Sequence, residues 1–212
     1  MIRLDELDRR AAVLRIVSVL RQGSVVLLPT DTVYGIAALP EDRAATEMLF
    51  TLKGRTESTP VAVLCADVDQ AITLADQRAA EALARVGARW WPGPLTVVVR
   101  RREGRSLHLG EPATTIGLRV PDHPVIGAVA AEVGPIAATS ANRHGEPTPT
   151  TADEAAAALG PGLGLVVDGG TLVSSASTVV DATNDPWVVL REGPISGLDV
   201  IAIAEAPEDG AR

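Results

Sequence analysis

Apolar residues recur along the chain in two patterns. Over residues 4–22 they stand three or four positions apart, which places them on one face of an α-helix, and Gly23 follows as a stop signal. Residues 25–28 are apolar without interruption and end at Pro29, as in a strand buried on both faces. The first pattern predicts helices at 4–22, 42–53, 67–88, 125–133 and 151–159. The second predicts strands at 25–28, 61–65, 95–99, 116–120, 136–138, 165–167, 178–180 and 187–190.

Helices and strands alternate through most of the chain, an order typical of a layered α/β domain. The last expected strands follow one another without a helix between them, so we expect part of the sheet to be antiparallel. No internal repeat or interdomain linker interrupts this order. The sequence therefore predicts one α/β domain over residues 5–200, with a twisted mixed sheet flanked by helices. A polar tail over residues 201–212 is expected to be frayed.

The composition is that of an ordinary globular protein with a core of small aliphatic side chains. Of 212 residues, 46% are hydrophobic, 22% are charged and only 2% are aromatic, and a domain of this size buries a sizeable core without disulfides. The single cysteine, Cys65, cannot form an intrachain disulfide and lies in an apolar run. We expect it to be a small buried hydrophobic residue.

The net charge of −8 argues against a surface that binds nucleic acid over its whole extent, because such binding needs many cations at phosphates. It leaves room for a few cations around one nucleotide. The N-terminal residues are charged and lack an apolar signal core, and no apolar run approaches the ~20 residues that span a bilayer. The sequence therefore predicts a cytoplasmic protein without membrane association.

Two polar motifs in the first third of the chain can carry chemistry. Residues 29–35, Pro-Thr-Asp-Thr-Val-Tyr-Gly, directly follow a buried strand, which is where ligands bind in open α/β sheets. Their hydroxyls and carboxylate can hold a small polar ligand, or can cap a turn by bonding local backbone. Lys53 and Arg55 end the helix expected at 42–53 and should both be exposed there. They suit a phosphate clamp, although cations are also ordinary at a helix C-terminus.

Two further motifs lie in the second half of the chain. Residues 139–150 follow a strand and precede a helix, and their Ser, Asn and Thr side chains can reach phosphate or ribose oxygens. A loop made of turn-forming residues has the same composition. Residues 177–181 read as a hydroxyl-rich strand, and residues 190–193 as a charged turn. Taken singly, neither motif distinguishes a site from ordinary structure.

Together, the order and spacing of these motifs resemble the YrdC-like family of threonylcarbamoyl-AMP synthases. Residues 29–35 are followed by Lys-x-Arg, Trp-Pro-Gly-Pro-Leu-Thr, Ser-x-Asn, Ser-Thr-Val-Val-Asp and Leu-Arg-x-Gly, over about residues 10–197. The resemblance implies an α/β fold with a large open cavity over the sheet. It also implies an enzyme that makes L-threonylcarbamoyladenylate and pyrophosphate from L-threonine, bicarbonate and ATP. Partner proteins would then transfer the threonylcarbamoyl group to an adenosine of tRNA, with weak or indirect tRNA contact by this chain.

The resemblance also implies roles for individual residues. Threonine-binding residues are expected at Thr32, Thr115, Arg119 and Ser177. ATP-binding residues are expected at Lys53, Arg55, Thr59, Ser140, Asn142, Thr150 and Arg191. Lys53 and Arg55 are in addition the expected catalytic residues.

This sequence departs from the family pattern in three places. Thr59 stands where many members carry Asn, and its hydroxyl can still bond a nucleotide. Leu64 stands where many carry His, which removes one expected contact to threonine or bicarbonate. His144 stands where many carry Ser. The chain ends soon after Arg191, so it resembles the short, single-domain members of the family.

The implied reaction needs no side-chain nucleophile, because the carbamate formed from threonine itself attacks the α-phosphorus of ATP. That carbamate is labile in water, so a closed cavity helps. Lys53 and Arg55 would offset charge on the phosphates, with Mg²⁺ as the expected third cation. The chain contains no Walker A motif, and its three histidines lack metal-ligand spacing, so we expect no protein-held metal.

Two other functions remain open at this stage. A YciO-like fold relative would share the fold but carry out a different adenylate-forming reaction or none, and Leu64 leaves room for it. An RNA-binding module without catalysis is disfavoured by the net charge of −8 and by the scarcity of aromatic side chains for base stacking.

Overall fold

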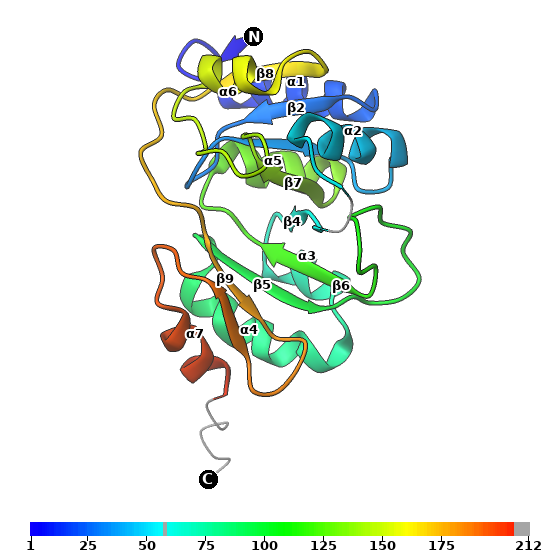
Figure 1. Ribbon diagram of the computed structural model, residues 1–212, viewed down its shortest axis with the longest axis vertical. Helices are drawn as coiled ribbons and strands as arrows, with labels where there is room; N and C mark the ends of the chain where they lie inside the picture. The colour runs from blue at the N-terminus through cyan, green and yellow to red at the C-terminus, as the bar shows by residue number, and fades with distance from the viewer. Residues whose placement is uncertain (57–58, 206–212) are drawn as a thin grey trace.

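One mixed sheet runs along the computed structural model, with helices packed against it (Figure 1). The structure describes residues 1–56 and 59–205, and in this part of the chain ten strands lie in the order β1-β8-β2-β3-β7-β4-β6-β5-β9-β10. The strands are β1 (Ile2–Arg3), β2 (Val25–Leu28), β3 (Gly35–Ala38), β4 (Ala62–Leu64), β5 (Leu95–Arg100), β6 (Thr115–Arg119), β7 (Ile136–Ser140), β8 (Leu163–Asp168), β9 (Thr178–Asp181) and β10 (Val188–Arg191). The helices are α1 (Arg9–Arg21), α2 (Arg43–Lys53), α3 (Val68–Leu74), α4 (Ala80–Trp90), α5 (Pro124–Val133), α6 (Ala152–Leu159) and α7 (Gly197–Ala204).

The pairing of the strands confirms the predicted mixed sheet. β2 lies antiparallel to β3 and parallel to β8. β4 lies parallel to β6 and antiparallel to β7. The late pair β9 and β10 is antiparallel, as expected for strands joined without a helix.

The half of the sheet that contains β2 is covered by helices on both faces. Val26 packs in a buried cluster with Ile16 of α1 and Ile126 of α5. Its neighbour Leu27 points to the other face and packs in a second cluster with Leu49 of α2. The uninterrupted apolar run of this strand therefore has the predicted cause, which is burial on both sides.

The half that contains β5, β6 and β9 is covered on one face only. Val97 of β5 and Leu118 of β6 pack against Leu83 of α4 and Val200 of α7, which lie together at the C-terminal end of the molecule (Figure 1). The alternate residues point to the opposite face, which these helices leave uncovered. The one-sided covering leaves an open floor on which a cavity can form.

The first helix begins later than predicted. Residues Ile2–Arg3 form β1 and pair with β8, so the residues before Asp8 are not helical. Asp8 is the N-cap of α1, and its carboxylate accepts a hydrogen bond from the Ala11 amide at 2.9 Å. Leu4 and Leu7 before it matched the helical spacing but lie in the turn between β1 and α1.

The helix predicted at 67–88 is two helices. α3 ends at Leu74, a short 3₁₀ turn covers Gln77–Ala79, and α4 follows. The break occurs because the Asp76 amide donates to the Arg100 carbonyl at 2.8 Å, which draws the chain to the end of β5. A contact with a distant strand therefore overrides a continuous Ala-rich pattern.

Besides β1, the elements β3 and α7 were not predicted. β3 consists of residues 35–38, Gly-Ile-Ala-Ala, which are too small and too few to show a strand pattern. α7 continues to Ala204, beyond the expected domain boundary at residue 200, and Ser196 caps it. The rest of the predicted tail, residues 206–212, lies outside the described residues.

Cys65 is fully buried, as predicted. Burial raises the pKa of its thiol to about 12, because the thiolate would lose its hydration. In the described ranges no helix has the length and apolar character that a membrane crossing requires.

Candidate active site

The open face of β5, β6 and β9 forms part of the wall of a cavity of about 330 Å³. Strands β3, β4, β7 and β10 and the loops after β2 and α2 complete the wall. Apolar side chains such as Leu64, Val98 and Val179 line it beside polar groups. Of the residues predicted for the site, those that line the cavity are Thr32, Arg55, Thr59, Thr115, Arg119, Ser140, Ser177 and Arg191. Lys53, Asn142 and Thr150 do not.

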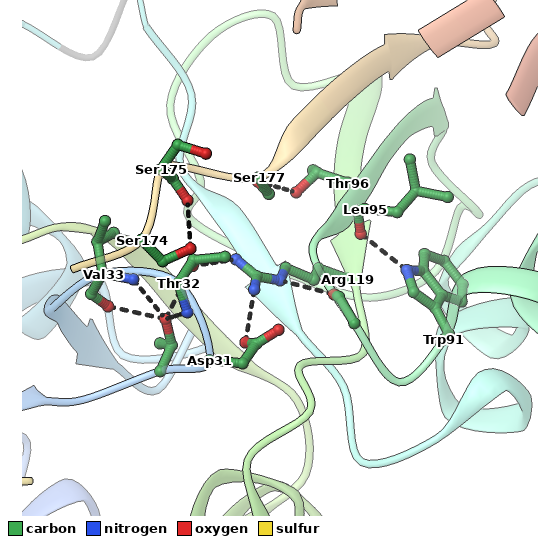
Figure 2. Close-up of polar contacts among 12 residues, drawn as sticks. Asp31, Thr32, Val33, Trp91, Leu95, Thr96, Arg119, Ser174, Ser175 and Ser177 are labelled. Carbon is green, nitrogen blue, oxygen red and sulfur yellow. Dashed lines mark hydrogen bonds and ion pairs between the residues drawn. The ribbon is translucent and has the colours of Figure 1, made fainter. Parts of the chain in front are cut away.

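Arg119 is buried at the end of β6 and is held from three directions (Figure 2). Its Nη1 donates to the Thr32 hydroxyl at 2.9 Å, and its Nη2 donates to Oδ1 of Asp31 at 2.5 Å. Its Nε donates to the Gly93 carbonyl at 3.2 Å. These contacts join the motif after β2 to the end of β6 and hold the guanidinium at the cavity wall.

Ser177 begins a second polar cluster at the start of β9. Its hydroxyl lies 2.9 Å from the Thr96 hydroxyl of β5, and Nη2 of Arg191 donates to it at 3.1 Å (Figure 2 shows the first of these contacts). Nε of Arg191 also donates to the Ser177 carbonyl at 2.9 Å. Partial burial and the positive charge of Arg119 lower the pKa of Arg191. Arg119 and Arg191 both line the cavity and give it positive charge.

Lys53 is buried, which contradicts the expectation of an exposed helix end. Its ammonium donates to the Ser140 carbonyl at 2.9 Å, to the Ser140 hydroxyl at 3.1 Å and to Oδ1 of Asn142 at 2.8 Å. Burial and the charge of Arg55 lower its pKa to about 8. Lys53 is the only lysine in the sequence. The hydrogen bonds of Lys53 tie α2 to the Ser-x-Asn turn, and its ammonium is occupied by protein acceptors.

Arg55 has different contacts from Lys53, and Gly54 stands between the two residues. Gly54 ends α2 in the left-handed conformation, with φ 62° and ψ 36°, and turns the chain sharply. The Arg55 guanidinium lies 5.6 Å from the centre of the Phe50 ring and lines the cavity. Its Nε and Nη2 atoms are buried and have no hydrogen-bond partner in the described ranges. These uncommitted donors can bind an anion in the cavity.

In the Ser-x-Asn turn and the residues after it, Ser140 lines the cavity, whereas Asn142 and Thr150 bond to neighbouring protein groups. Oδ1 of Asn142 accepts from Lys53, and its amide donates to the Glu146 carbonyl at 2.6 Å, so this side chain holds the loop. Thr150 is exposed and bonds Glu154 next to the start of α6. The predicted nucleotide contacts of these two residues stay predictions, and this structure places neither at the cavity wall.

Two residues of the site lie within motifs of the sequence but were given no individual role there. Thr30 lines the cavity, and its hydroxyl lies 3.0 Å from that of Thr32. Thr96 lines the cavity between two core residues of β5. A polar residue at an alternate position of an otherwise apolar strand is the signal that could have identified Thr96.

The charge of the cavity suits anionic ligands. Three guanidinium groups line it, those of Arg55, Arg119 and Arg191, and Asp31 pairs with only one of them. In the described ranges, no three His, Cys, Asp or Glu side chains gather in a metal-binding group. Mg²⁺ that is held by nucleotide phosphates and water needs no such group. The residues of the cavity are therefore compatible with Mg²⁺ that enters bound to a nucleotide.

Comparisons with known proteins agree with the motifs. The family model Sua5_yciO_yrdC, described as "Telomere recombination", matches residues 18–193. The chain is 36% identical over 195 residues to the putative threonylcarbamoyl-AMP synthase of Mycobacterium tuberculosis strain H37Rv, which covers 91% of this chain and 88% of that protein. It is 36% identical over 189 residues to the threonylcarbamoyl-AMP synthase of Bacillus subtilis, covering 88% of this chain and 54% of that protein.

Solved structures share the fold. The structure of P. abyssi Sua5 complexed with L-threonine matches with a TM-score of 0.81 and 32% identity, over 94% of this chain and 58% of that longer chain. E. coli YciO matches with a TM-score of 0.77 and 28% identity, over 89% of this chain and 92% of that chain. Motifs, fold and relatives agree, and the chain belongs to the Sua5/YciO/YrdC family.

Proposed function

We propose that this protein is a threonylcarbamoyl-AMP synthase, which uses L-threonine, bicarbonate and ATP. The observation that carries the proposal is one cavity lined both by the buried Arg119 and Thr32 and by the uncommitted donors of Arg55. Such a cavity can hold a carboxylate and phosphates at the same time. The curated relatives of that name and the threonine-bound Sua5 structure support the proposal.

In the proposed reaction, the amine of threonine forms a bond to the carbon of bicarbonate, with loss of water, and gives a carbamate. A carbamate oxygen then forms a bond to the α-phosphorus of ATP as the bond to the bridging oxygen of pyrophosphate breaks. Phosphoryl-type transfer of this kind depends mainly on positioning and charge stabilisation. The cavity needs no nucleophilic side chain for it.

The residues of the cavity divide this work. The remaining N–H groups of Arg119 and the Thr32 hydroxyl would bind the threonine carboxylate and orient the amine. The free donors of Arg55 would bind phosphate oxygens. Lys53 would act indirectly, because it holds the turn that places the Ser140 hydroxyl at the cavity wall. The apolar wall around Leu64 would exclude water that hydrolyses the carbamate.

Mg²⁺ is proposed to enter bound to the ATP phosphates, where it would neutralise charge on the leaving pyrophosphate. The product would pass to proteins that transfer the threonylcarbamoyl group to tRNA, with at most indirect tRNA contact by this chain. A YciO-like relative without this activity is the second candidate. It is favoured by the similarity to YciO over 92% of that chain and by the apolar Leu64 in the cavity wall.

The test is pyrophosphate release from ATP, with L-threonine and bicarbonate each omitted in turn. We expect release to require both, and L-serine or L-alanine to substitute poorly. ATP binding without threonine-dependent release would contradict the synthase and favour the YciO-like relative. A filter-binding assay with RNA at low salt tests the remaining candidate, since an RNA-binding module would retain RNA and the proposed enzyme would not.

A further inference from the structure

Two buried hydroxyls, those of Thr96 and Ser177, form a hydrogen-bonded pair on the cavity wall. Their oxygens lie 2.9 Å apart, and the two residues are only 6% and 5% exposed (Figure 2). Both residues line the cavity, and Nη2 of Arg191 donates to the Ser177 hydroxyl at 3.1 Å. In the described ranges neither hydroxyl has a further hydrogen-bond partner.

This pair keeps one O–H group for a ligand, whichever hydroxyl donates to the other. Each hydroxyl has one proton and can accept hydrogen bonds as well. One of the two protons lies between the oxygens, and Arg191 donates to Ser177, so the second proton meets no acceptor among the described residues. Nη1 of Arg191 likewise makes no hydrogen bond to that part of the chain. A free hydroxyl beside a guanidinium suits an anion with several oxygens.

The strand pairing places the pair between two arginines. Val97 of β5 stands opposite Leu118 of β6, so the next residues on the two strands, Thr96 and Arg119, are cross-strand neighbours. On its other side Thr96 pairs with a residue of β9 that pairs in turn with Arg191 of β10. Neighbouring strands are about 5 Å apart, so an anion bound over Thr96 lies close to the Arg119 side chain.

The proposed reaction needs bicarbonate at such a place. The neutral amine of threonine forms a bond to the bicarbonate carbon, and the hydroxyl of bicarbonate leaves with one amine proton as water. A carbamate oxygen then attacks the α-phosphorus of ATP. Reacting atoms must approach to about 3–3.5 Å, so bicarbonate must bind between the amino acid and the nucleotide. Arg119 is the proposed threonine contact and Arg191 an expected ATP contact, and the hydroxyl pair lies between them.

We propose that the Thr96–Ser177 pair is the bicarbonate subsite, in which one hydroxyl donates to a bicarbonate oxygen beside the positive charge of Arg191. The inference rests on the proposed function and assigns its third substrate a place. Thr96 is then a substrate-binding residue. Ser177 is held at this place by the two hydrogen bonds that Arg191 donates to its hydroxyl and its carbonyl.

Two substitutions separate the hydroxyl of Thr96 from its shape. Thr96→Val keeps the branched side chain and removes the hydroxyl, whereas Thr96→Ser keeps the hydroxyl and removes the methyl group. Pyrophosphate release is measured in CO₂-depleted buffer, with bicarbonate, L-threonine and ATP each varied in turn. Thr96→Val should raise the KM for bicarbonate on the order of tenfold, as one lost hydrogen bond implies, and Thr96→Ser should stay within about threefold of the original.

The KM values for the other two substrates show whether the effect is specific. Those for L-threonine and ATP should change less than about twofold in both variants. Thr46→Val is a matched control, because it removes a buried hydroxyl that bonds carbonyls at the start of α2 and lies outside this cavity. An unchanged KM for bicarbonate in Thr96→Val, or a larger rise in the KM for L-threonine or ATP, would overturn the proposal.

Carbon-13 NMR tests the same subsite without activity, with labelled bicarbonate as the probe. The unmodified protein, Thr96→Ser and Thr46→Val should broaden the bicarbonate signal, and Thr96→Val should leave it close to its width in buffer. Equal broadening by Thr96→Val and the unmodified protein, or none by the latter, would reject the subsite. Failure of threonine-dependent pyrophosphate release in the unmodified protein would reject the proposed function instead, while the NMR result would still decide whether bicarbonate binds at Thr96.

Discussion

At the scale of single residues, the Lys-x-Arg motif separates into two different roles. Lys53 is buried and bonded to the Ser140 and Asn142 turn, whereas Arg55 reaches the cavity with uncommitted donors. The sequence motif alone suggests two equivalent cations. Gly54, in the left-handed conformation, stands between them.

The pKa of Lys53 can be measured directly because the chain has no other lysine. Labelling with isotope-enriched lysine gives one side-chain signal. We expect it to titrate at about 8, because burial and the charge of Arg55 disfavour the ammonium form. A midpoint at the ordinary value of 10.5 would show that this ammonium is hydrated and not buried as the structure has it.

The same shift predicts how stability depends on pH. The native pKa of Lys53 is lower than the unfolded one, so between pH 8 and 10.5 the unfolded chain binds more protons and the native state gains stability as the pH rises. Between pH 8 and pH 10 the gain should be roughly 2 kcal/mol. The measurement is urea unfolding of the original protein and of Lys53→Met, and their difference should grow with pH. A constant difference would contradict the prediction.

Arg55 is the clearest candidate for a phosphate contact. Arg55→Ala should lower kcat/KM for ATP on the order of 100-fold, because a preorganised donor to the reacting phosphates is lost. Arg55→Lys should recover only part of the activity, since an ammonium keeps the charge but lacks the planar fork. Arg78→Ala is a matched control, because that side chain is 92% exposed and lies outside the cavity. Normal activity of Arg55→Ala would remove Arg55 from the phosphate site.

At the scale of elements, helix ends aim the functional side chains. Thr151 caps α6 through a reciprocal pair with Glu154. The C-terminus of α2 depends on Gly54, whose φ of 62° suits glycine and around which a Cβ atom would meet no neighbour within 4 Å. Any cost of substitution there is therefore conformational and not steric.

Gly54→Ala should lower the free energy of unfolding by about 1 kcal/mol, because a Cβ atom disfavours the left-handed conformation. Gly54→Asn should cost less, since asparagine adopts this conformation more readily. Urea unfolding of the two variants checks both values. If alanine and asparagine destabilise equally, the backbone conformation is not the cause.

At the scale of the whole molecule, the cavity joins distant parts of the chain. Its lining extends from Thr30 to Arg191 and draws on seven strands of the sheet. A ligand bound there contacts both the half covered on two faces and the half covered on one. Ligand binding should therefore oppose global unfolding and not only local opening.

Urea unfolding with and without ATP and Mg²⁺ tests this linkage. At about 100 times the dissociation constant, ATP should raise the free energy of unfolding by about 2.7 kcal/mol. Arg55→Ala should reduce the gain at the same ATP concentration, because its affinity is lower. Absence of any gain at ATP concentrations that saturate pyrophosphate release would contradict a shared, global site.

Local patterns determined much of this protein from its sequence. The run at 25–28 and the helix at 42–53 agree with β2 and α2 almost to the residue, because burial on two faces and helical periodicity depend on neighbours in the chain. The motif inventory also located most of the cavity wall, since loops that follow buried strands meet at one edge of a sheet. The weak or overridden patterns, at 35–38 and 67–88, are those whose structure depends on distant strands.

Only the tertiary structure decided which side chains share the cavity and which support it. Lys53 turns inward, Thr96 joins Ser177, and Arg119 pairs with Asp31 across a long stretch of chain. No spacing in the sequence specifies these contacts, because each joins elements that the sheet order brings together. Periodicity in the sequence reflects interactions between residues that are close along the chain. Hydrogen bonds between buried polar groups depend instead on how the whole chain packs.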